Sequence, residues 1–187
     1  MKKFELTNEF VTNMFGTKLF RIRALVEFGD VEAGELGGYV EKESNLGHDD
    51  NAWVYDNARV YGNAWVSGNA QVSGNARVYG NAWVYGDAQV SGDARVSGNA
   101  RVYGNGDYAY AHGFGSVNRT TTFFRLKDGG VGVRCGCFYG TLAQFRDKIR
   151  ETHGETKKAQ EYLMLADLME LRFEEDENEV GNRKYVE

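Results

Sequence analysis

Proline is absent from the chain, and only two cysteines and three histidines occur among its 187 residues. Cys135 and Cys137 are two apart in one expected strand, so they share a face but are poorly placed for a disulfide of normal geometry. Together with the scattered His48, His112 and His153 they make a poor zinc set. We therefore expect neither a metal site nor a secreted disulfide scaffold, and we expect no cofactor.

Long apolar runs are also missing, because none approaches the ~18 residues that a membrane-spanning helix needs. The opening MKKFELTNEF is basic but lacks the apolar stretch of a secretory signal. The net charge is -5, and no segment is basic enough to act as a general nucleic-acid arm. With 42% apolar and 13% aromatic residues, the chain is too rich in core-forming side chains to be disordered. These features predict a folded cytoplasmic protein with neither a membrane nor nucleic acid as a general partner.

An internal repeat dominates the centre of the sequence. Residues 52–105 read as nine consecutive hexads of the form A-x-V-x-G-N/D, with Asp56 in place of the first glycine. Within a hexad, alanine and valine are two apart, so both face one side of an extended strand. The glycine and the Asn or Asp after it tolerate the positive φ that a tight corner requires. Each hexad therefore predicts one short strand and one corner, with only small side chains facing inward.

This pattern resembles the hexapeptide-repeat family, whose chains form a left-handed parallel β-helix of triangular section. In that family three hexads make one coil, so the resemblance implies three regular coils and stacks residues that are eighteen positions apart. It also implies that Val54 and its equivalents, and Ala58 and its equivalents, point inward. Members of the family usually form trimers, so we expect a homo-oligomer, either a trimer or a dimer.

Stacking at this spacing sorts the outward residues into columns. One face would carry Arg59, Arg77 and Arg95 with Tyr61 and Tyr79 alongside. Another would carry an aromatic stripe of Trp65, Trp83, Tyr85 and Tyr103. A third would carry Trp53, Gln71 and Gln89. The columns are the candidate binding surfaces.

Each column has two interpretations. Stacked arginines repel one another unless something negative sits beside them, and guanidinium forks with aromatic faces suit a phosphate-bearing ligand. The alternative is that the arginines lie on tyrosine rings or pair with acidic residues of the flanking segments. Exposing the aromatic stripe to water would be energetically unfavourable, which favours a subunit contact or, alternatively, a contact with a partner protein.

The flanks are expected to cap the coils, because an open end would expose the interior and unpaired backbone. Before the repeat, 19–28 predicts a strand paired with 10–15, and 33–58 predicts an irregular first coil with Val40 and Leu46 inward. After it, 120–140 predicts a β-hairpin about Asp128 and Gly129. A helix would follow Thr141 and end at Gly154, with a second helix at about 156–173.

The expected fold is therefore mainly β: a left-handed parallel β-helix of three to four coils, an N-terminal β cap, and a C-terminal cap of a β-hairpin and two helices. The expected domains are 1–50, 51–112 and 113–187. The stretches FRIRALVEFGDVEAGELGGYVEKESNL and SVNRTTTFFRLKDGGVGVRCGCFYGTLAQFRDKIRETHG, together with the repeats, also resemble uncharacterised repeat proteins of bacteriophages and prophages. That resemblance implies action in the cytoplasm of a bacterial host.

Many hexapeptide-repeat proteins are acyltransferases that use a histidine as general base, but the nine hexads hold no histidine and no loop insertion. His48 and His112, at the two ends of the repeat, are the only candidate bases. The first hypothesis is therefore a non-enzymatic binding protein that inhibits or sequesters a host protein, for example one of anti-phage defence, or a phosphorylated small molecule such as a nucleotide signal. The alternatives are an acyltransferase and a structural or assembly module of a phage particle.

Overall fold

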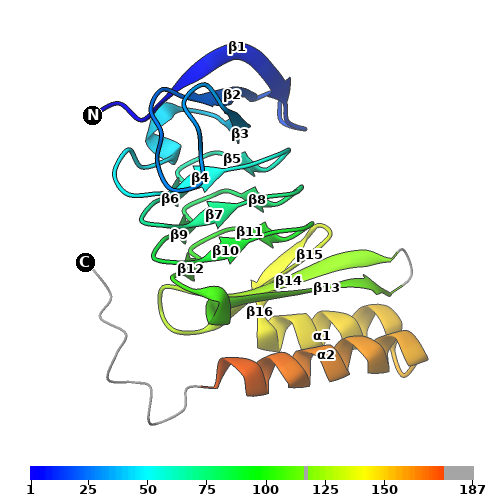
Figure 1. Cartoon of the computed structure of the whole chain (residues 1–187). Helices are drawn as coiled ribbons and strands as arrows, with labels where there is room; N and C mark the ends of the chain where they lie inside the picture. The colour runs from blue at the N-terminus through cyan, green and yellow to red at the C-terminus, as the bar shows by residue number, and fades with distance from the viewer. Residues whose placement is uncertain (116–117, 175–187) are drawn as a thin grey trace.

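The computed structural model describes residues 1–115 and 118–174, and a β-solenoid of about four turns forms its centre (Figure 1). Three parallel ladders run along it, β3-β5-β8-β11, β4-β7-β10 and β6-β9-β12. The strands are β3 (Leu36–Val40), β4 (Trp53–Val54), β5 (Arg59–Val60), β6 (Trp65–Val66), β7 (Gln71–Val72), β8 (Arg77–Val78), β9 (Trp83–Val84), β10 (Gln89–Val90), β11 (Arg95–Val96) and β12 (Arg101–Val102).

The interior of the solenoid is filled by the alanine and valine of every hexad, as the sequence predicts. All nine valines are fully buried, and each alanine has at most 1% of its surface exposed. Successive turns hydrogen-bond in one direction, with the backbone N–H of Trp53 donating to the carbonyl of Ala70 at 3.0 Å and that of Tyr55 to Val72 at 2.8 Å. The tube is therefore packed and leaves no lumen for a ligand.

The corners explain why glycine recurs every six residues. Gly62 has φ +72°, the glycines of the next six hexads behave alike, and Asp56 adopts the same left-handed region at φ 52°. Gly104 of the ninth hexad is extended, with φ -148°, where the chain leaves the solenoid. A Cβ at Gly68 would come within 3.0 Å of the backbone nitrogen of Gly86 in the next turn, so the close stacking of corners also favours glycine.

The N-terminal end of the solenoid is covered by an antiparallel pair, β1 (Phe4–Thr12) and β2 (Lys18–Ala24), which continues into β3. The expected partner strand at 10–15 is confirmed over 10–12, which pair with 18–20, but its bounds are wrong, because the strand begins at Phe4 and 13–17 form the turn. Val40 and Leu46 face inward as predicted. Trp53 was expected on an outer face, but its side chain is completely buried under Phe4 and Phe28. The centroids of these two rings lie 6.2 and 5.3 Å from the centroid of the Trp53 ring.

The first turn leaves carbonyl groups without a turn above them, and the cap supplies donors. The Lys3 ammonium donates to the carbonyls of Ala52 at 2.9 Å and Asp50 at 3.2 Å. Asn45, in the 3-10 turn η1 (Glu43–Asn45), donates through its side-chain amide to Ala64 at 2.8 Å and Gly62 at 3.1 Å. Both side chains are buried, so this end of the ladder is sealed by polar groups from the flank.

The C-terminal end is covered by a four-stranded antiparallel sheet with two helices packed on it (Figure 1). Its elements are β13 (Tyr108–Phe114), β14 (Arg119–Arg125), β15 (Val131–Cys135), β16 (Phe138–Thr141), α1 (Leu142–His153) and α2 (Lys157–Phe173). The expected hairpin and both helices are present, with Thr141 capping α1. Cys135 and Cys137 do not share a strand, because Gly136 and Cys137 form the turn into β16. Among the described residues, no helix has the length and apolar character to cross a membrane.

Here the last turn leaves N–H groups unpaired, and the cap supplies acceptors. The N–H of Arg95 donates to the Thr122 hydroxyl at 2.9 Å, and that of Gln89 to the side-chain carbonyl of Asn105 in η2 (Asn105–Asp107) at 2.8 Å. On the third face, the N–H of Tyr103 donates to the Asp107 carboxylate at 3.0 Å.

Because the tube is full, a larger inward residue should destabilise it. We expect Ala76→Leu to lower the free energy of unfolding by about 1–3 kcal/mol through overpacking. Gln89→Leu, at an exposed outward position, should change it by less than about 0.5 kcal/mol. Urea denaturation measures both, and an equal loss in the two variants would contradict the filled-tube interpretation.

Burial lowers the pKa of Lys3 from 10.5 to about 8, while Asp50 and Asp49 act in the opposite direction. Between about pH 8 and 10.5 the unfolded chain therefore holds a proton that the folded chain has lost, so this group makes the free energy of unfolding rise with pH. Lys3→Met should remove that contribution. Denaturation at pH 8 and 10.5 measures the free energy of unfolding of both proteins. The value for wild type minus that for the variant should grow with pH, and a constant difference would contradict the prediction.

Candidate functional site

The arginine column forms as the eighteen-residue spacing predicts. Arg59, Arg77 and Arg95 are register partners on β5, β8 and β11, so their backbones are stacked roughly 4.8 Å apart. Arg77 and Arg95 are half-buried. Three like charges at this spacing repel one another unless a counter-charge lies nearby.

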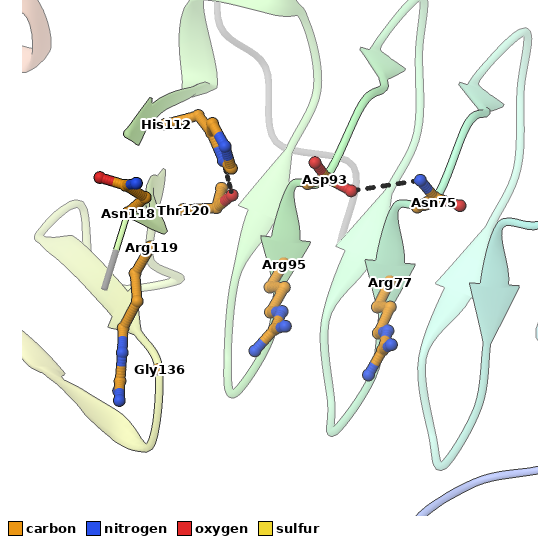
Figure 2. A pocket seen from close by; sticks show the side chains of 9 residues that line it. All are labelled: Asn75, Arg77, Asp93, Arg95, His112, Asn118, Arg119, Thr120 and Gly136. Atoms are coloured by element: carbon orange, nitrogen blue, oxygen red, sulfur yellow. Dashed lines mark hydrogen bonds between the residues drawn. The ribbon is translucent and has the colours of Figure 1, made fainter. Parts of the chain in front are cut away.

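A pocket of about 430 Å³ opens beside the last two arginines of the column, where the solenoid meets the C-terminal sheet (Figure 2). The solenoid and the sheet both contribute to it, and its lining residues are Asn75, Arg77, Asp93, Arg95, His112, Asn118, Arg119, Thr120 and Gly136. We call this the arginine pocket. Arg59, one turn further from the sheet, is not among its lining residues.

The arginine pocket is strongly positive. Figure 2 shows the side chains of Arg77, Arg95 and Arg119 extending in the same direction. The three guanidinium groups make no hydrogen bond or ion pair with any residue that the structure describes. Asp93 is the one carboxylate among the described residues that line the pocket, and it accepts a hydrogen bond from the Asn75 amide at 3.2 Å. One carboxylate cannot balance three guanidinium groups, so the geometry favours an anion here.

The two candidate bases lie at opposite ends of the solenoid. His112 is exposed and lines the arginine pocket, with its Nδ1 2.8 Å from the Thr120 hydroxyl. His48 lies in the N-terminal cap, where its Nε2 is 2.9 Å from Glu43 and its ring stacks on Phe4 at 4.5 Å. His48 is therefore held by cap contacts, and only His112 shares a pocket with the arginine column.

The two tyrosines of this face stack on each other rather than lining the pocket. Their ring centroids are 5.0 Å apart and the rings are 3° from parallel. The Arg134 guanidinium lies 5.8 Å from the centroid of the Tyr79 ring. Burial raises the pKa of Tyr61 and Tyr79 adds to the rise, while Arg77, Arg134 and Arg95 oppose it. Tyr61 and Tyr79 thus form a flat wall next to the arginines.

The residues of the expected aromatic stripe also come together, on the β6-β9-β12 face. Trp65, Trp83, Tyr85 and Tyr103 line a second pocket of about 480 Å³ with Asp49 and Asp50. No arginine of the column lines it, so the two candidate surfaces are separate.

Sequence reasoning missed the contribution of the C-terminal sheet to the arginine pocket. Arg119 begins β14, and a Cβ at Gly136 would overlap its guanidinium, so this glycine leaves the space that Arg119 occupies. Gly136 also has φ +59°, which disfavours other residues. The only available signal was an arginine and a histidine in neighbouring strand segments, and nothing in the sequence says which face of the solenoid they would meet.

Comparison with known proteins supports the solenoid. A family model described as the YdcK beta solenoid repeat matches residues 52–68, 70–86 and 88–104. The three matches begin eighteen residues apart, which is one turn of the ladder register. No curated protein matches the chain. The repeat β-helix is therefore supported by both the family match and the structure.

Repulsion among the arginines of the arginine pocket should destabilise the ligand-free protein. We expect Arg77→Gln to raise the free energy of unfolding by a few tenths of a kcal/mol at low ionic strength, with the gain shrinking as salt is added. Arg146→Gln is the matched control, because Arg146 pairs with Asp167 at 2.8 Å and Glu170 at 2.7 Å and its loss should destabilise. Denaturation at 20 mM and 500 mM salt measures the change in the free energy of unfolding for both variants. A destabilised Arg77→Gln would contradict the prediction and indicate that Arg77 has a stabilising partner.

Proposed function

We propose that this chain is a non-enzymatic binding protein whose arginine pocket holds a phosphorylated small molecule. The observation that carries the proposal is that three guanidinium groups line one pocket beside a single carboxylate and make no hydrogen bond or ion pair with a described residue. Guanidinium forks bind phosphoryl oxygens through two parallel hydrogen bonds, and an anion between them removes the repulsion that the empty column suffers.

The remaining lining residues favour an organic phosphate over a bare phosphate ion. Asp93 and Asn118 offer oxygen acceptors, and Thr120 offers a hydroxyl, among the residues that line the same pocket. Such groups suit the hydroxyl and amide groups of a sugar or base better than phosphoryl oxygens, which only accept. A nucleotide-like ligand combines both halves, with its phosphates at Arg77, Arg95 and Arg119.

In the wider proposal the chain is a hexapeptide-repeat protein of phage or prophage origin that acts in the cytoplasm of its bacterial host as a homo-oligomer. A protein that sequesters a nucleotide signal, including one of anti-phage defence, needs tight binding and no catalytic group. A host protein carrying such a phosphate is the corresponding macromolecular target.

An acyltransferase is the second candidate, and one observation favours it. His112 lines the arginine pocket, where an exposed imidazole near an acceptor hydroxyl would be placed to take its proton. The acyl carrier would then use the arginines for its phosphates, so the two candidates share a pocket but differ in the role of His112.

Thermal unfolding with added pyrophosphate and a panel of mononucleotides and dinucleotides tests the proposal. At a ligand concentration 100-fold above Kd, the expected stabilisation is about 2.7 kcal/mol, or roughly 5–10 °C in Tm. Arg77→Gln and Arg95→Gln should abolish the shift, and 500 mM salt should reduce it. Arg59→Gln, the same change in the same column outside the pocket, should keep it.

The panel also separates the two candidates. A shift with nucleotides that survives His112→Ala supports sequestration. A shift that occurs only with coenzyme A and is lost in His112→Ala would favour the acyltransferase over sequestration. No shift with any phosphorylated compound, or equal shifts in Arg59→Gln and Arg77→Gln, would remove the proposal.

A further inference from the structure

The second pocket lies on the β6-β9-β12 face and is built differently from the arginine pocket. We call its four rings, Trp65, Trp83, Tyr85 and Tyr103, the aromatic groove. Trp65 is 38% exposed and Tyr103 is 50% exposed, so large ring surfaces face water. Exposed aromatic surface of this extent on a rigid ladder marks a surface that contacts another molecule.

The rings are arranged in two edge-on pairs. The centroids of Trp65 and Trp83 are 5.5 Å apart with the rings at 81°, and those of Tyr85 and Tyr103 are 5.2 Å apart at 66°. A near-perpendicular pair cannot cover both faces of both rings. Each row of the aromatic groove therefore keeps a ring face that its partner leaves uncovered, and ring faces carry the negative side of the quadrupole.

The chain already places one cation on these rings. The Arg101 guanidinium lies 4.2 Å from the centroid of Trp83, and its Nη1 donates to the carbonyls of Asn81 and Ala100, both at 2.9 Å. Burial lowers the pKa of Arg101. A guanidinium is thus held on the tryptophan column at the end near the C-terminal sheet, in the geometry of a cation–π contact.

The other end of the groove is acidic. Asp49 and Asp50 are exposed and line the same pocket as the rings. The Lys3 ammonium contacts their backbone carbonyls at 3.5 and 3.2 Å and interacts electrostatically with both carboxylates, and neither carboxylate lies within ion-pair distance of a cation that the structure describes. Two carboxylates beside the four aromatic rings attract a positive group and disfavour a negative one.

We propose that the aromatic groove binds an arginine-containing segment of a partner protein. One guanidinium lies against the rings, as Arg101 does within the chain, and a neighbouring cation of the segment pairs with Asp49 and Asp50. A volume of about 480 Å³ fits the side chains of a short extended segment. The proposal does not depend on the phosphate ligand, because the two pockets share no residue.

The probe is an acetylated Gly-Arg-Gly-Arg-Gly amide, with its citrulline counterpart as a neutral control of the same shape. Titration is followed by tryptophan fluorescence and by calorimetry on the full chain. We expect saturable binding of the arginine peptide, at least tenfold weaker binding of the citrulline peptide, and further weakening at high salt.

Two variants locate the site. Tyr103→Leu removes a ring face and should weaken binding roughly 3- to 30-fold. Asp50→Asn keeps the left-handed backbone at φ 57°, which asparagine tolerates, and should weaken binding by a smaller factor. Arg77→Gln, in the other pocket, should bind the peptide as wild type does. Unchanged melting temperatures show that the two groove variants are folded.

Several results would overturn the proposal. These are no binding of the arginine peptide at millimolar concentration, equal binding of the citrulline peptide, or full binding by both groove variants. Displacement of the peptide by a neutral oligosaccharide such as cellotriose would assign the rings to sugar stacking. If sedimentation shows a dimer or trimer that Tyr103→Leu converts to a monomer, the aromatic groove is instead the contact between copies of the chain.

Discussion

The direction of the backbone hydrogen bonds governs the whole molecule. Each turn of the solenoid donates its N–H groups to the carbonyls of the next turn, so one end of the stack has spare acceptors and the other has spare donors. An unpaired buried backbone group costs about as much as a lost hydrogen bond. The flanking segments supply the complementary groups, with donors at one end and acceptors at the other. Lys3 and Asn45 donate at one end, whereas Thr122, Asn105 and Asp107 accept at the other.

The arginine pocket is a by-product of this capping. Thr122 of β14 must reach the N–H of Arg95, so the sheet has to lie against the β11 face of the last turn. The same strand carries Arg119, and β13 carries His112, so the contact that ends the ladder also brings these groups to the arginine column. Arg59 lies at the other end of the column, next to Tyr39 of β3 and away from the C-terminal sheet, which is why two of the three column arginines line the pocket.

Most of the solenoid could be predicted from the sequence, because a period of six with alanine and valine two apart permits few solutions. The burial of every repeat valine follows from the spacing within the hexads, and the register of Arg59 with Arg77 follows from the three hexads per coil that the family resemblance implies. Trp53 shows the limit, since its outward direction is a local property but its burial depends on Phe4 and Phe28 in a distant segment. The same applies to Arg119, because the docking of one segment on another depends on side-chain fit that has no period.

The repeat separates what the molecule must keep from what it is free to vary. Inward positions accept only small residues, and the corners require glycine or a residue tolerant of positive φ, so structural demands fall on the same places in every turn. Outward positions carry no such demand, and the chain uses Arg77 and Trp83, six residues apart, for opposite chemistry on two faces. A rigid ladder holds both at fixed spacing without ordering a loop, so a ligand on either face meets groups that are already in place. The solenoid therefore lets one short sequence present a surface lined by guanidinium groups and a surface lined by aromatic rings and carboxylates at once.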